Sequence, residues 1–168
     1  MSIVRILGID PGLNITGYGL IEINNNKPSL IKYGHIRTNS KDSLSERLHQ
    51  IFQNLNSLIA EYKPDRVAIE DLFYAENIKT AIVMGHARGA AIVAAMQNKA
   101  IVSEFSPREV KMSVVGNGAA AKNQVKFMVS NILSIKEKIT PDDASDALAA
   151  ALCQWHRIQM ESKGLKKK

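Results

Sequence analysis

The segment GIDPGLNITGYGLIE, residues 8–22, places one acid at the end of an apolar run. That run covers residues 3–9 and stops at Asp10, and a Pro-Gly turn then leads into a second apolar run with two further glycines. Two apolar runs separated by a short turn are typical of paired strands. The pattern raises two questions: why a strand ends on a carboxylate, and why so much glycine follows it.

Further strand and helix patterns follow this segment along the chain. Strands are predicted over residues 3–9, 15–23, 28–37, 66–70 and 100–105, and helices over 43–62, 77–97, 107–114, 121–134 and 141–160. Three strands joined by short turns predict an antiparallel meander, whereas strands reached through helices should run parallel to the first. The expected fold class is therefore α/β, with a mixed five-stranded sheet flanked by helices.

The composition is that of an ordinary globular chain. Its 168 residues are 45% hydrophobic and 23% charged, which predicts one domain over residues 1–160. No apolar run reaches the roughly 18–20 residues of a membrane span. The chain has one cysteine, Cys153, which favours a reducing compartment, and no secretory leader pattern precedes the first strand. We therefore expect a cytoplasmic protein without a membrane partner.

The positive charge is concentrated at one end. The chain carries a net charge of +6, and the terminal sequence KGLKKK contains four lysines. A lysine-rich terminus is typically solvated, so residues 161–168 are predicted to form a basic, disordered tail. Basicity alone makes nucleic acid only one possible partner.

Acids from three distant parts of the chain are expected to meet at one edge of the sheet. Asp10 ends the first strand and Glu70 ends the fourth, and ligands of α/β sheets gather beyond the carboxyl ends of parallel strands. Asp143 and Asp146 lie three residues apart in the last helix and so share one helix face. With no arginine placed to pair with Asp146, these oxygen donors favour Mg²⁺ or Mn²⁺.

Simpler interpretations of the same residues remain open at this point. Asp10 could serve the Pro-Gly turn, and Glu70 could be a solvated strand end. Thr140 and Asp143 could form the N-cap and capping box of the last helix.

The glycines allow two interpretations as well. Gly12, Gly17 and Gly19 could keep side chains away from a phosphate backbone that approaches the acids, or they could serve only turns and strand twist.

Five segments occur in order between residues 3 and 157: ILGIDPGLNITGYGLIE, AIEDLFYAENIKTA, HARGAAIVAA, SPREVKMSVVGNGAAAKNQV and DDASDALAAAL. Together they resemble the RuvC family of crossover junction endodeoxyribonucleases. The resemblance implies a ribonuclease-H-like fold, a homodimer, and paired symmetric nicks in four-way (Holliday) DNA junctions during recombination and repair. It also implies two Mg²⁺ ions per site, with Mn²⁺ able to substitute, and cooperation with the branch-migration proteins RuvA and RuvB.

Carried over by position, the resemblance assigns the catalytic and metal-binding residues: Asp10, Glu70, Asp143 and Asp146. The neighbouring acids Asp142 and Asp71 are not counted as ligands. Lys111 and Lys122 match family positions near the scissile phosphate, and Phe73 is expected to stack on a base. The alternatives are that both lysines are merely exposed and that Phe73 is a core residue.

Three other functions are compatible with part of this sequence pattern. An ATP-binding protein of the actin group would use the Pro-Gly turn as a phosphate loop, but it needs two related domains. A junction-binding protein without catalysis would need the basic residues but not four acids. A nuclease acting on RNA–DNA hybrids would share the same chemistry.

A stripe of small residues in the 77–97 helix (Ala81, Gly85 and Gly89) is expected to lie near a dimer contact.

Overall fold

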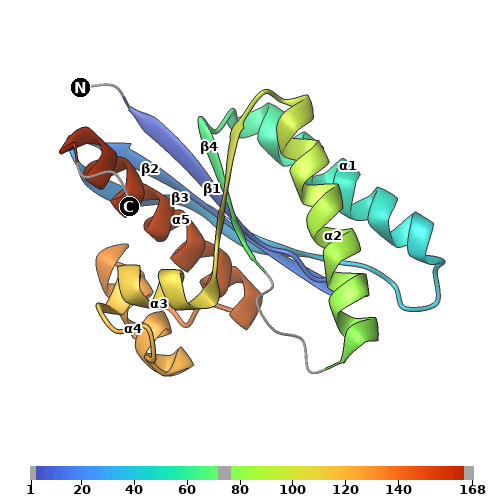
Figure 1. The fold of residues 1–168 in the computed structure, drawn as a ribbon. Helices are drawn as coiled ribbons and strands as arrows, with labels where there is room; N and C mark the ends of the chain where they lie inside the picture. Colours follow the sequence, from blue (N-terminus) through green and yellow to red (C-terminus); the bar gives the residue numbers. More distant parts are fainter. Residues whose placement is uncertain (1–2, 72–76, 165–168) are drawn as a thin grey trace.

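A computed structural model describes residues 3–71 and 77–164 of the chain. Its single five-stranded sheet has the strand order β3-β2-β1-β4-β5 (Figure 1). The strands are β1 (Val4–Asp10), β2 (Ile15–Asn24), β3 (Lys27–Arg37), β4 (Arg66–Glu70) and β5 (Ile101–Phe105). The helices are α1 (Leu44–Tyr62), α2 (Ile78–Gln97), α3 (Pro107–Val115), α4 (Lys122–Ile132) and α5 (Asp142–Ser162).

The direction of each strand agrees with the prediction from the sequence. Strands β1, β2 and β3 pair in antiparallel fashion, and β4 and β5 are reached through helices and run parallel to β1. In the parallel pair, Ile9 lies opposite Ile69, which brings the ends of β1 and β4 side by side. The mixed sheet is thereby confirmed.

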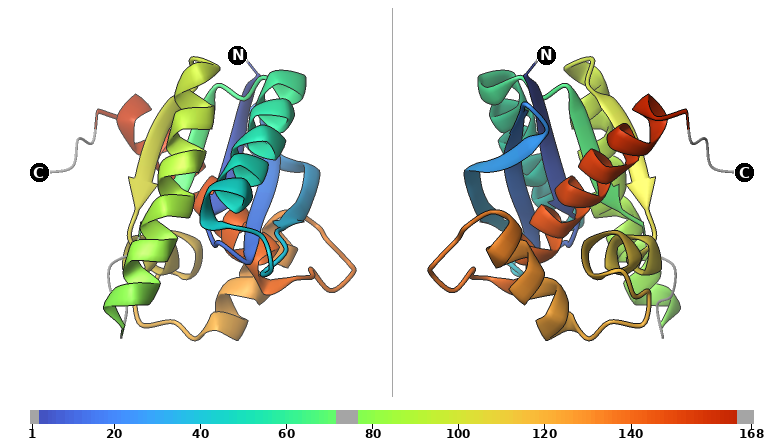
Figure 2. Two further views of the ribbon diagram at one scale, coloured as in Figure 1. Left: turned by 90° about the vertical axis from the view of Figure 1, so that its right-hand side faces the viewer. Right: turned by 90° about the vertical axis from the view of Figure 1, so that its left-hand side faces the viewer.

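The helices cover the two faces of the sheet unequally. Helices α1 and α2 pack on one face, and α5 crosses the other face with α3 and α4 beside it (Figures 1 and 2). Alternate residues of each strand serve the two layers, as the period of a strand requires. In β4, Val67 and Ile69 are buried toward α1 and α2, whereas Ala68 is buried in the layer that contains α5.

The helix boundaries follow from local capping. Ser43 and Ser106 start α1 and α3 with capping boxes that their third helical residues complete. Helix α5 has Pro141 at its N-cap position and no side-chain cap, so the alternative in which Thr140 caps it is wrong. Helix α5 also continues to Ser162, two residues into the predicted tail. No helix within residues 3–71 and 77–164 is both long and apolar enough to cross a membrane.

The glycines of β1 and β2 form the contact surface for α5. A Cβ atom at Gly17 would overlap the backbone of Asp143, and one at Gly8 would overlap the backbone of Ala147. A Cβ at Gly19 would lie 2.5 Å from side-chain atoms of Leu148. The interpretation that Gly17 and Gly19 make room for DNA is therefore wrong, because their missing side chains leave room for a helix of the same chain.

Candidate active site

Two of the four candidate acids lie at the carboxyl ends of adjacent parallel strands. Asp10 is the last residue of β1 and Glu70 is the last residue of β4, and both are partly buried. Their strands are hydrogen-bonded neighbours, so the expectation that both acids reach the same sheet edge is confirmed. Their burial makes simple solvation an insufficient explanation for either carboxylate.

Helix α5 brings the other two acids to the same edge. Asp143 and Asp146 lie in its first two turns, and the absence of a side chain at Gly17 lets the backbone of Asp143 pack directly on β2. Because Gly17 lies opposite Asp10 in the β1–β2 pairing, this contact places the start of α5 beside the end of β1. The opening segment of the chain thus supplies both an acid and the surface that holds two more.

Burial and the charges of neighbouring acids raise the pKa values of Asp10 and Glu70. Burial raises the pKa of Asp10 to about 8, and the charge of Glu70 is the next largest cause. The charges of Asp146 and Asp143 raise the pKa of Asp10 further. Burial likewise raises the pKa of Glu70 to about 7, with Asp146 adding to the effect. The site therefore holds more negative charge than its own lysines neutralise.

A lysine supplies the counter-charge that the sequence did not predict for Asp146. Lys122, the first residue of α4, places its Nζ 2.8 Å from Asp146 Oδ2. The sequence places no arginine to pair with Asp146, and its partner is instead a lysine. Partial burial lowers the pKa of Lys122, but the hydrogen bond and charge of Asp146 outweigh it and leave that pKa raised.

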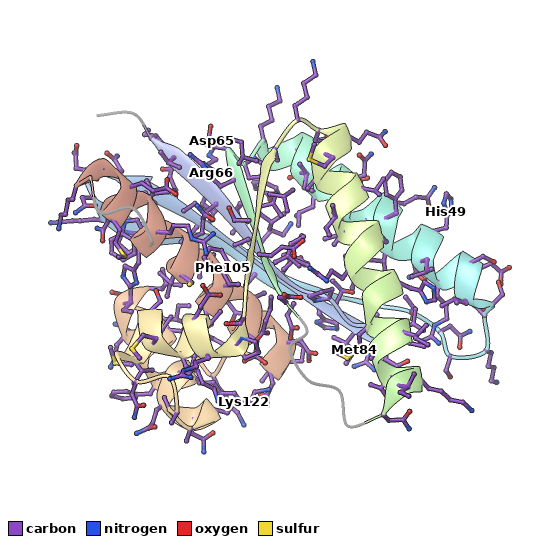
Figure 3. The ribbon with its side chains drawn as sticks, in the orientation of Figure 1. His49, Asp65, Arg66, Met84, Phe105 and Lys122 are labelled. Atoms are coloured by element: carbon purple, nitrogen blue, oxygen red, sulfur yellow. The ribbon has the colours of Figure 1, made fainter. Side chains whose placement is uncertain are left out.

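Of the residues predicted to contact DNA, the two lysines lie near the acids. Lys111 lies in α3, and its positive charge, like that of Lys122, lowers the pKa of Glu70, so both lysines lie close to the acids. Figure 3 shows Lys122 at the end of the molecule where α5 begins, far from Asp65 and Arg66. Phe73 lies outside the described residues.

The two acids excluded from the ligand set have other partners. Asp142 is exposed, and its Oδ1 is 2.6 Å from the Nζ of Lys126, which lowers the pKa of Asp142. Asp71 follows Glu70 and pairs instead with Arg88 of α2. These contacts agree with the choice of Asp143 over Asp142.

Sequence reasoning missed a buried arginine that fixes the turn after Asp10. Arg47 of α1 donates from Nε to Thr38 Oγ1 at 2.9 Å and from Nη2 to the side chain of Asn14. Thr38, which follows β3, in turn donates its hydroxyl to the carbonyl of Leu13, so the turn is held by side chains of α1 and of the segment after β3. The only sequence signal was a cationic residue on the apolar face of the predicted 43–62 helix.

The residues at this edge fit a divalent cation by charge and donor type. All four acids offer carboxylate oxygens, the ligands that Mg²⁺ and Mn²⁺ prefer. Burial, and after it the charges of neighbouring acids, raise the pKa values of Asp10 and Glu70. Within residues 3–71 and 77–164, however, no three acidic, histidine or cysteine side chains converge tightly enough to hold one ion. For three of these carboxylates to ligate one cation, their side chains would have to draw closer together.

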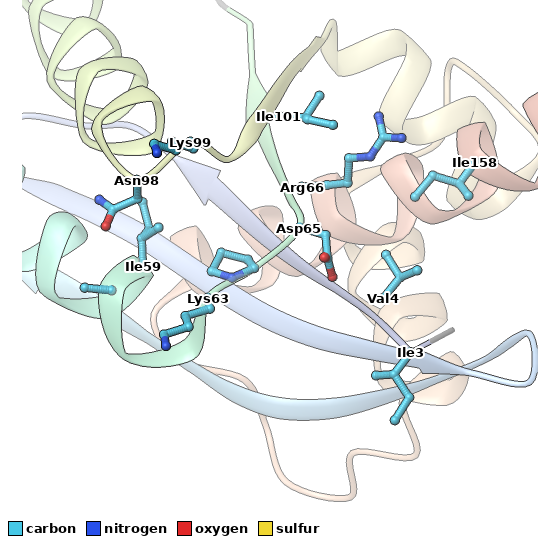
Figure 4. A pocket seen from close by; sticks show the side chains of 12 residues that line it. Ile3, Val4, Ile59, Lys63, Asp65, Arg66, Asn98, Lys99, Ile101 and Ile158 are labelled. Atoms are coloured by element: carbon cyan, nitrogen blue, oxygen red, sulfur yellow. The ribbon is translucent and has the colours of Figure 1, made fainter. Parts of the chain in front are cut away.

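A separate pocket lies at the opposite end of the sheet. It measures about 830 Å³ and is lined in part by Val4 at the start of β1, Asp65 and Arg66 at the start of β4, and Lys63 and Lys99 (Figure 4). Val4 and Asp10 are the two ends of β1, six residue steps apart, a distance on the order of 20 Å. This pocket is therefore separate from the cluster of acids.

The strand order, the acids at the carboxyl edge and the helix laid across β1 and β2 define a ribonuclease-H-like nuclease. Residues 6–154 match the family model described as crossover junction endodeoxyribonuclease RuvC. This match covers most of the chain and includes all four candidate acids. The chain belongs to the RuvC family.

Individual relatives agree with this assignment over nearly their whole lengths. The RuvC of Alkaliphilus metalliredigens is 46% identical over 157 residues, which cover 94% of this chain and 96% of the relative. A structure of Thermus thermophilus RuvC in complex with a Holliday junction substrate is 31% identical, with a TM-score of 0.90, and covers 95% of this chain and 97% of its own. The yeast mitochondrial Holliday junction resolvase, at 16% identity and a TM-score of 0.68, shares the fold; the match covers 96% of this chain and 82% of its own.

Proposed function

We propose that this protein resolves four-way DNA junctions by two symmetric nicks, as a metal-dependent endodeoxyribonuclease of recombination and repair. In each nick, a water oxygen forms a bond to phosphorus while one phosphorus–oxygen bond of the DNA backbone breaks. The observation that carries the proposal is the partly buried group of acids at the β1–β4 edge, within a chain that matches the RuvC family over residues 6–154.

Asp10, Glu70, Asp143 and Asp146 would hold the metal, which we propose to be two Mg²⁺ ions with Mn²⁺ able to substitute. When bound, such ions activate water and stabilise the leaving oxygen of a phosphodiester. The chain itself contributes the carboxylates, whose mutual repulsion bound cations would relieve. The turn held by Arg47 keeps Asp10 at the end of β1.

Lys111 and Lys122 are proposed to contact the phosphates next to the cut. Both lie close enough to Glu70 to lower its pKa, so a phosphate at the acids would meet their positive charge. The side chain of Lys122 is about half exposed, although its ammonium group pairs with Asp146. Phe73 is proposed to stack on a base at the crossover, as the family resemblance implies.

A homodimer would supply the two sites that symmetric cutting needs. An unusual stripe of α2 supports this proposal, because its large apolar residues face outward: Ile78 is 79% exposed, Ile82 55%, Val93 57% and Met96 59%. Between them, Gly85 and Gly89 have open space where a Cβ atom would lie. The spacing of three and four residues gives one continuous helix face, which a second copy could cover.

The cellular setting follows from this activity. We propose that the protein acts in the cytoplasm, where the chromosome of a bacterium lies, and that RuvA and RuvB bring junctions to it.

The direct test is to incubate the protein with a synthetic four-way junction, a duplex and an RNA–DNA hybrid, each with and without Mg²⁺. We expect paired nicks at symmetric positions in the junction alone, and only with the metal. Asp10→Asn and Asp146→Asn should abolish the nicks and retain the fold by circular dichroism. Cleavage of the hybrid in preference to the junction, or wild-type rates in either variant, would overturn the proposal.

A further inference from the structure

Arg88 joins the ends of two strands from the opposite face of the sheet. It lies in α2, and its Nη2 is 3.2 Å from Asp71 Oδ1 and also contacts a carboxylate oxygen of Glu104. Asp71 immediately follows Glu70 of β4, and Glu104 is the penultimate residue of β5. One guanidinium group therefore holds two carboxylates, each next to the point where its strand ends.

The backbone of Asp71 is tied down at the same place. Its amide donates to the carbonyl of Phe105 at 2.7 Å, which extends the β4–β5 pairing by one residue beyond Glu70. Phe105 lies opposite Glu70 and is buried in the layer of α5, where Figure 3 shows it, whereas Glu104 reaches α2. Since neighbouring residues of a strand face opposite sides, a grip on Asp71 and Glu104 directs Glu70 toward α5.

Arg88 also neutralises negative charge near this edge of the sheet. Asp71 and Glu104 each carry a negative charge close to an edge that already holds four acids. With Arg88 replaced by a neutral residue, their repulsion from one another and from Glu70 would favour rotation of the strand end away from the site.

We propose that Arg88 is a positioning residue for Glu70, which it holds at the catalytic edge by fixing Asp71 and Glu104 on the α2 side. The inference rests on the proposed function in one respect, because the effect of the positioning is measured as the rate of junction cleavage. That Arg88 fixes the strand end is inferred from its contacts alone.

If Arg88 only stabilised the fold, its loss would change at most the melting temperature and leave the cleavage rate unchanged. Partly exposed ion pairs contribute only about 0–1 kcal/mol to stability, so losing them should change the melting temperature little. A displaced catalytic group, in contrast, can cost on the order of 100-fold in rate. The matched control is Arg5→Gln, which breaks the partly exposed pair between Arg5 Nε and Glu22 Oε2, 3.1 Å apart, in strands β1 and β2.

The first measurement is amide hydrogen exchange in metal-free protein without DNA. Arg88→Gln should accelerate exchange at Asp71 at least about tenfold, and Arg5→Gln should leave it unchanged. Unchanged exchange at Asp71 in Arg88→Gln would overturn the inference, whatever the protein's activity proves to be.

The second measurement separates kcat from KM on the four-way junction. Arg88→Gln should lower kcat roughly 10- to 100-fold with KM unchanged, Arg88→Lys should recover part of the loss, and Arg5→Gln should match the wild type. A wild-type kcat in Arg88→Gln would overturn the inference while the proposed function stands. A wild-type protein that leaves junctions uncut would instead overturn the proposed function, and exchange at Asp71 would still decide whether Arg88 fixes the strand end.

Discussion

The Nζ of Lys122 lies 2.8 Å from Asp146 Oδ2, so the lysine pairs with a carboxylate that is also a candidate metal ligand. The lysine and a bound cation would therefore compete for one carboxylate. We expect Lys122→Gln to bind Mn²⁺ about 3- to 10-fold more tightly than the wild type, a difference of about 1 kcal/mol. Calorimetric titration of metal-free protein measures this directly. Lys126→Gln, which frees Asp142 instead, is the control, and weaker Mn²⁺ binding by Lys122→Gln would contradict the prediction.

The stability of the metal-free protein should fall as the pH rises. In the folded protein the pKa of Asp10 is about 8 and that of Glu70 is about 7, both above their ordinary values of 3.8 and 4.5. Between about pH 4 and pH 8 the folded state therefore binds more protons than the unfolded state, and the free energy of unfolding decreases with pH.

The variant Asp10→Asn isolates the larger of these two contributions. Because each unit of pKa shift is worth about 1.4 kcal/mol, Asp10→Asn should be more stable than the wild type at pH 8 by a few kcal/mol, and about equally stable at pH 4. Urea unfolding curves in a chelating buffer at both pH values provide the measurement. The same pH dependence in both proteins would show that ionisation of Asp10 does not cause the loss of stability.

Two glycine substitutions should have opposite effects. Gly17→Ala forces α5 away from β2 because the new methyl group meets the backbone of Asp143, so we expect a loss of about 1–3 kcal/mol and a large fall in activity. In the monomer, at concentrations too low for dimerisation, Gly85→Ala places its methyl group in open space within a helix and should gain up to about 1 kcal/mol. Denaturant unfolding of both variants tests this pair, and a neutral Gly17→Ala would count against close helix packing there.

The salt dependence of junction binding should identify the lysines that contact phosphates. Removing Lys111 or Lys122 by alanine substitution should each reduce the slope of log K against log salt by about 0.9, the value for one phosphate contact on duplex DNA. Binding is measured without divalent metal so that the junction stays intact. Lys63→Ala and Lys99→Ala, at the opposite end of the sheet, serve as controls. If all four variants share one slope, Lys111 and Lys122 make no such contact.

Substitutions of the neighbouring residues Asp142 and Asp143 should have very different effects on the cleavage rate. Asp143→Asn is expected to lower kcat at least about 100-fold, because its charge is part of the group around Asp10. Asp142→Asn should retain a rate close to that of the wild type, since the Asp142 side chain is exposed and paired with Lys126. Single-turnover cleavage of the junction compares them, and the reverse order would exchange the roles of the two residues.

The chain's local patterns were sufficient to predict the sheet and the location of its acids. Strand periodicity, turn residues and the need for a helix between parallel strands depend only on neighbouring residues, and they predicted both the meander and the parallel pair. Because strands that run parallel finish at the same edge, the sequence predicted that Asp10 and Glu70 would share an edge if their strands were neighbours, and the structure shows that β1 and β4 are neighbours.

Contacts between elements could be determined only by the tertiary structure. Gly17 and Gly19 looked suited to an approaching phosphate backbone, yet α5 occupies the space beside them. The sequence placed no arginine to pair with Asp146, yet Lys122 reaches it from another helix, and Arg88 binds acids of two strands. Periodicity tells which way a side chain faces along its own element. Which distant group it then meets depends on how helices and strands pack in three dimensions, and the order of residues along a chain does not specify that packing.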